Sequence, residues 1–146
     1  MMYVENSTDS INSCFYSSFL FLINTAICWY YGDFIYASLF FALFITSIIV
    51  HSYTNIYTIL IDKLSIIGVV LYGGYIFWEK CREPGDIEKL VHGVLIVYTF
   101  IVTIFLYYFG YLYKKYCFCE NREVANIWHS FLHLVSCIGH GMIVCM

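Results

Sequence analysis

The sequence predicts an all-α integral membrane protein, a bundle of about five transmembrane helices. Of the 146 residues, 62% are hydrophobic and only 12% are charged, whereas a soluble domain carries about 25% charged residues. The hydrophobic residues also form long blocks instead of alternating with polar ones, as in membrane spans. We therefore expect residues 1–146 to form a single transmembrane domain. The net charge of −3 offers no basic surface, which excludes nucleic acid as a partner.

Five apolar blocks are each close to the ~20 residues that cross the hydrocarbon core as a helix. Their approximate bounds are 13–31, 34–52, 57–78, 90–113 and 127–146. Lipid offers no water to satisfy backbone groups, so we expect helices throughout these blocks. The segment Met1–Asn12 is polar and has no Lys or Arg, so we do not expect a secretory signal there.

The connections between the blocks follow from local composition. The first block is the least apolar, since Asn24 lies in its middle, and Gly32-Asp33 predicts a tight turn after it. The second block is rich in Phe, Ile and Leu. A charged loop containing Pro84-Gly85 separates the third block from the fourth, and Lys114-Lys115 with a polar stretch precedes the fifth. No internal repeat is visible.

Histidines in the last block are its most informative feature. His129 and His133 are four residues apart, so they share one face of a helix, and His140 returns to nearly the same face seven positions later. Earlier in the chain, Ser47 and His51 share a face at the end of the second span, and Asp62 lies in the first turns of the third. An ionised Asp near a helix centre costs roughly 2.5–3.5 kcal/mol to insert, so Asp62 is a functional candidate.

The number of spans predicts that these residues meet. If five helices cross the membrane, the second ends, and the third and fifth begin, on the side where the N-terminus lies. His51, Asp62, His129 and His133 then occupy the same half of the bilayer. Three imidazoles form the ligand set of a catalytic zinc that keeps its fourth position for water. We expect His51, His129 and His133 to bind Zn²⁺, with Asp62 as the carboxylate that accepts a proton and Ser47 as a nearby hydroxyl.

This combination resembles the CREST superfamily, the membrane proteins that include alkaline ceramidases and adiponectin-receptor-like proteins. The family pattern of Ser-x-x-x-His, an Asp early in the next helix, and His-x-x-x-His in the last helix is matched by Ser47-Ile-Ile-Val-His51, Asp62 and His129-Ser-Phe-Leu-His133. A Trp directly before the histidine pair, here Trp128, is a feature in which this chain resembles the ceramidase branch of the superfamily. The resemblance implies a zinc-dependent hydrolase that cleaves an amide or ester bond of a membrane lipid. Trp128 and His140 are then candidates to line the substrate pocket, and an endomembrane such as the ER or Golgi is one expected location.

Family members usually have seven helices, so the resemblance implies a shortened form that lacks two helices and part of the pocket wall. Either a second copy completes the pocket in a homodimer, or the site is degenerate. Two alternatives stay open. In the first, the chain is a non-enzymatic receptor or scaffold with a structural zinc. In the second, it is a small multi-pass protein without metal, whose polar side chains join helices by hydrogen bonds. We expect that packing role for His92, which lies near the opposite side of the membrane.

Overall fold

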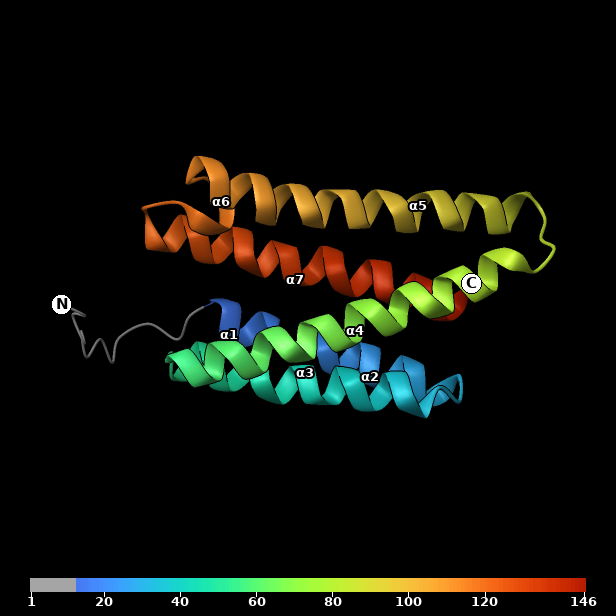
Figure 1. Cartoon of the computed structure of the whole chain (residues 1–146), viewed down its shortest axis with the longest axis horizontal. Helices are drawn as coiled ribbons and strands as arrows, with labels where there is room; N and C mark the ends of the chain where they lie inside the picture. Colours follow the sequence, from blue (N-terminus) through green and yellow to red (C-terminus); the bar gives the residue numbers. More distant parts are fainter. Residues whose placement is uncertain (1–12) are drawn as a thin grey trace.

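The structure is a computed structural model that describes residues 13–146, so the expectation for Met1–Asn12 lies outside the described residues. Within that range it contains five helical segments that are long and apolar enough to cross a membrane, and no strand (Figure 1). The predicted all-α bundle of five spans is confirmed. In chain order the segments are α1 (Ser13–Ser17) with α2 (Leu20–Tyr30); α3 (Phe34–Ser52); α4 (Ile56–Arg82); α5 (Ile87–Ile104) continued by a π-helical turn η1 (Phe105–Phe109), α6 (Gly110–Tyr113) and a 3₁₀ turn η2 (Tyr116–Phe118); and α7 (Arg122–Cys145).

Four of the long helices begin at an Asp or Asn whose side chain caps the first turn. The side-chain oxygens of Asp33, Asn55, Asp86 and Asn121 accept hydrogen bonds from backbone N–H groups at the starts of α3, α4, α5 and α7. Such caps satisfy amides that have no partner within the helix. Gly32 precedes the first of them with a φ of 80°, a left-handed conformation that favours glycine.

The helices form a bundle in which α3 packs against both α2 and α4, while α7 packs against α1, α2 and α5 (Figure 1). At 27 residues, α4 is about 40 Å long, more than the ~30 Å of hydrocarbon, so it is long enough to cross with a tilt or with an end that protrudes. Figure 1 shows α4 crossing the bundle obliquely. The end of α3 and the starts of α4 and α7 lie at the same end of the bundle as α1, as the number of spans predicts.

The first span differs from the single helix that the sequence predicts, because it is interrupted between α1 and α2. The hydroxyls of Ser17 and Ser18 both donate to the carbonyl of Cys14, at 3.1 and 2.8 Å. Serine hydroxyls that bond to the preceding turn compete with the helical backbone ladder and bend helices. Further along the span, the buried Asn24 donates to the backbone carbonyl of Cys137 at 3.0 Å, so its amide attaches the first span to α7.

The third, fourth and fifth spans are longer than the apolar blocks that predicted them, whereas α3 has the predicted bounds. Helix α4 continues to Arg82, and α7 begins at Arg122 because Asn121 caps it there. The residues added at the end of α4 and at the start of α7 include charged side chains, Lys80 and Arg82 in the first helix and Arg122 and Glu123 in the second. The fourth span passes through η1, a departure from regular α-helix that apolar composition alone does not reveal.

His140 lies within the bundle rather than in the histidine cluster at its end. The hydroxyl of the buried Tyr36 forms a hydrogen bond with Nδ1 of His140, and the rings of Tyr36 and Phe40 meet the imidazole edge to face. Gly73 of α4 lies directly against this pair. A Cβ at Gly73 would collide with the Tyr36 hydroxyl and come within 2.8 Å of Nδ1 of His140. The close approach of α4 to α3 and α7 therefore requires glycine at this position.

We expect Gly73→Ala to lower the free energy of unfolding by about 1–3 kcal/mol, the usual cost of overpacking a filled core. Gly74→Ala is the matched control, because a Cβ there meets no atom within 4 Å. Thermal unfolding of both variants in detergent micelles makes the comparison. Equal melting temperatures for Gly73→Ala and the wild type would contradict the packing described here.

Candidate metal centre

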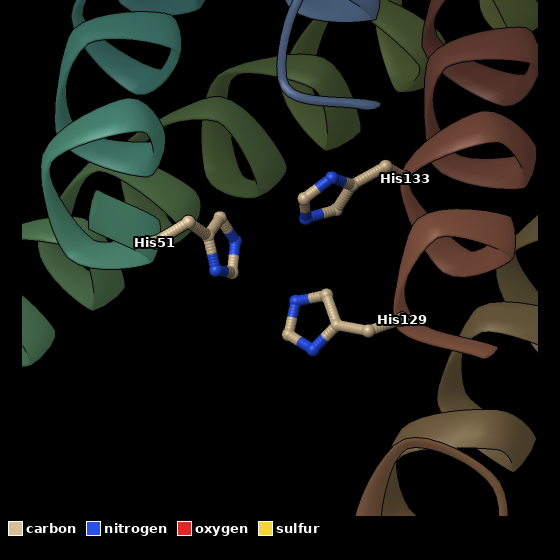
Figure 2. A group of neighbouring side chains, drawn as sticks. All are labelled: His51, His129 and His133. Atoms are coloured by element: carbon tan, nitrogen blue, oxygen red, sulfur yellow. The ribbon is translucent and has the colours of Figure 1, made fainter. Parts of the chain in front are cut away.

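Two helices that are far apart in the sequence bring three of the five histidines together. His51 is the penultimate residue of α3, and His129 and His133 lie on successive turns of α7. The ring centroids of His129 and His133 are 4.9 Å apart, and the His51 centroid is 5.2 Å from the first and 5.5 Å from the second. Figure 2 shows the three rings gathered in the space between α3 and α7, with a nitrogen of each turned towards the others.

The donor set fits a zinc ion. One nitrogen from each imidazole lies within 4.8 Å of the other two. In a tetrahedral site with Zn–N bonds of ~2.0–2.1 Å, ligand nitrogens stand about 3.4 Å apart, so the three nitrogens would have to approach one another to bind one ion. Three neutral imidazoles leave the fourth position of the metal for water or substrate. The structure therefore brings together the three histidines that the sequence analysis names as candidate ligands.

His133 is the most enclosed of the three, with only 6% of its surface exposed. Its Nδ1 lies 2.8 Å from the hydroxyl oxygen of Ser17, and the ring of Phe21 covers it at a centroid distance of 5.0 Å. Both partners belong to the first span. Sequence reasoning missed Ser17, because a serine in an apolar span is usually bonded to its own helix and nothing in the spacing indicates a partner on α7.

Ser47 lies one turn before His51, as predicted, but its hydroxyl contacts the first span. The Ser47 oxygen is 2.8 Å from that of Ser18, and both side chains are buried. Since the single hydrogen of Ser18 is donated to the carbonyl of Cys14, Ser47 is the donor in this pair. Ser47 thus joins α3 to the first span at the level of the histidine cluster.

Asp62 lies on α4 beside α3 and is half-buried. Its carboxylate accepts a hydrogen bond of 3.1 Å from the hydroxyl of Thr46, and it is not a member of the group of clustered ligand atoms. Thr46 precedes His51 by five residues, which corresponds to about 140° around the helix and ~7.5 Å along it. The carboxylate therefore lies deeper in the bundle than His51 and beside a different face of α3. Lys63 turns away from it and donates to the hydroxyl of Tyr107 at 2.8 Å.

The remaining candidates lie farther along the helices. His140 is on the wall of a cavity of about 280 Å³ between α4, α5 and α7, where Thr99, Thr103 and Ser136 are among the other lining residues. Trp128 packs its ring against Tyr116 and Phe131 and is not among the residues that line this cavity.

His92 lies near the start of α5, at the end of the bundle opposite the histidine cluster. Its Nδ1 is 3.0 Å from the carbonyl of Glu88, one turn earlier in the same helix. The bond that the structure gives His92 is therefore local to its own helix.

Taken together, the spans and the cluster define a multi-pass α-helical membrane protein with three histidines gathered near one end of the bundle. No protein-family model matches the chain, and no curated protein or solved structure matches it. The function is therefore argued from the fold and the site themselves.

We expect wild-type protein, purified in detergent without chelator, to contain about one zinc ion per chain, since three imidazoles form a sufficient protein ligand set. The double variant His129→Ala, His133→Ala removes two of the three ligands and should lose the metal. His92→Ala is the matched control, because His92 bonds only within its own helix turn in the structure. Elemental analysis by mass spectrometry measures the zinc. Its retention by the double variant, or its absence from the wild type, would contradict a site at these residues.

Proposed function

We propose that this membrane protein is a zinc-dependent hydrolase that cleaves an amide or ester bond of a membrane lipid. The observation that carries the proposal is the convergence of His51, His129 and His133, which come from two helices and leave one coordination position open. The match of these residues and Asp62 to the CREST pattern supports the same reaction class. An ER-like endomembrane is the location we propose on that ground.

The depth of the site supports a lipid substrate. His51 is one residue from the end of α3, and His129 is in the second turn of α7, so the cluster lies near the boundary between hydrocarbon and headgroups. The amide and ester groups of membrane lipids lie at this boundary, between polar headgroup and acyl chain. A lipid in the adjacent leaflet would thus present its carbonyl at the level of the three imidazoles.

When bound, zinc would polarise the substrate carbonyl and make water a nucleophile at neutral pH. The chain's own residues would divide the remaining tasks. The three imidazoles would hold the ion without neutralising its charge, and the ring of Phe21 would cover the His133 side of the site. Asp62 would take the proton of the attacking water, either by turning away from Thr46 or through a second water molecule, and pass it to the departing group.

A structural zinc is the second candidate, and the hydrogen bonds of Ser47 and Asp62 favour it. Both side chains are bonded within the bundle, to Ser18 and Thr46, rather than directed into the cluster. A zinc ion would then join α3 to α7 and stabilise a receptor or scaffold without turning over any lipid. Product formation separates this function from the first.

We expect Asp62→Asn to retain zinc but to reduce lipid hydrolysis by about 10²–10⁴-fold, because the amide cannot accept the proton of water. Glu79→Gln is the matched control, since it makes the same change of functional group on α4 at the far end of the helix, where Glu79 is exposed. The assay measures fatty acid released from ceramide and from a panel of ester lipids, using zinc-loaded protein in lipid nanodiscs. A zinc-loaded wild type that releases no fatty acid from any of these lipids would favour the structural function.

A further inference from the structure

The interruption of the first span places two neighbouring serines between the two helices that carry the histidines. Ser17 reaches His133 on α7, and Ser18 reaches Ser47 on α3, each at an oxygen–nitrogen or oxygen–oxygen distance of 2.8 Å. Adjacent residues of a helix point about 100° apart, which allows one short segment to contact both helices. The first span, which carries none of the three histidines, is thus in hydrogen-bond contact with both ligand-bearing helices.

The segment that carries Ser17 is itself fixed against α7. The thiol of the buried Cys14 contacts the backbone carbonyl of Asn126 at 3.4 Å, and the hydroxyl oxygen of Ser130, which donates to the same carbonyl, lies 3.9 Å from the Cys14 sulfur. These contacts lie on the turns of α7 adjacent to His129 and His133. The position of the Ser17 hydroxyl relative to His133 is therefore set by packing on both sides of the contact.

The direction of the hydrogen bond matters for a metal ligand. An imidazole has two nitrogens, and in the neutral ring the one that carries hydrogen cannot bind a metal. The Ser17 hydroxyl lies 3.1 Å from the carbonyl of Cys14, which can only accept its hydrogen. With its hydrogen on that carbonyl, the Ser17 oxygen can accept the N–H of His133 at Nδ1, and Nε2 then keeps its lone pair. Figure 2 shows one nitrogen of the His133 ring turned towards His51 and His129 and the other turned away from them.

We propose that Ser17 is a positioning residue of the metal centre: it accepts a hydrogen bond from Nδ1 of His133, fixes the orientation of the ring and reserves Nε2 for the metal. This inference deepens the proposed function. It rests on one part of that proposal, the binding of a metal by the three histidines, and does not require that a lipid is hydrolysed. Hydrogen-bond partners of this kind orient ligating histidines, and their loss commonly weakens metal binding by about 10–100-fold.

The test compares zinc affinity, measured by competition with a chromogenic chelator, in wild type and three variants. Ser17→Ala should raise the zinc dissociation constant by about 10–100-fold, and Ser17→Thr, which keeps a hydroxyl, should restore most of the affinity. Thr25→Val is the matched control: it removes a hydroxyl from the same span, one that bonds only to its own helix at the carbonyl of Phe21, and it preserves the side-chain shape. An unchanged affinity in Ser17→Ala would overturn the inference.

A second measurement does not depend on how well the variants fold. Nitrogen NMR of ¹⁵N-histidine-labelled, zinc-free wild type identifies which ring nitrogen of His133 carries hydrogen. The inference expects hydrogen on Nδ1, and a ring protonated only on Nε2 would overturn it.

The outcomes also separate this inference from the proposed function. Zinc binding that depends on Ser17, without lipid turnover, would remove the hydrolase and leave the positioning role. Lipid turnover, together with a zinc affinity that does not change in Ser17→Ala, would remove the positioning role and leave the hydrolase. A wild type that binds no zinc would remove both.

Discussion

The need to satisfy every polar group without water governs this structure. In hydrocarbon, an unpaired donor or acceptor costs several kcal/mol, so a polar side chain within a span must find its partner on another helix or on its own backbone. No buried side-chain nitrogen or oxygen in residues 13–146 lacks a hydrogen-bond partner. The partners are specific: Asn24 contacts the backbone of α7, and Tyr36 contacts His140. The same demand that holds the helices together therefore also fixes the surroundings of the three clustered histidines.

Much of the fold could be predicted from the sequence, because the blocks of apolar residues and the residues between them carry independent information. Block length indicates membrane spans, and the Asp33 turn marks one helix start without reference to hydropathy. Contacts of single side chains decide the helix ends and interruptions that block length does not predict. The interruption after Ser17 depends on hydroxyls that bond backward, and the start of α7 depends on the cap at Asn121. Hydropathy averages over such single side-chain interactions.

The candidate site divides in the same way. Helical spacing placed His129 and His133 on one face, and the number of spans placed His51 at the same end of the bundle, so their convergence could be predicted. The partners of Ser47 and Asp62 could not. Each lies on a helix with neighbours on several sides, and spacing within one helix does not say which neighbour a side chain meets. Only the tertiary structure shows that Ser47 bonds to the first span and that Asp62 bonds to α3. These two bonds are the reason that a structural function stands beside the catalytic one.

The origin of the three clustered histidines on α3 and α7 has a consequence for the biosynthesis of the protein. Membrane helices insert one after another as they are synthesised, so His51 enters the bilayer long before His129 and His133 exist. Asn24 of the first span likewise cannot donate to the backbone carbonyl of Cys137 until α7 has been synthesised and inserted. The three histidines therefore come together only when α7 has docked between the earlier helices and α5. A metal that needs all three imidazoles, as proposed above, could therefore not be held by a nascent chain that still lacks α7.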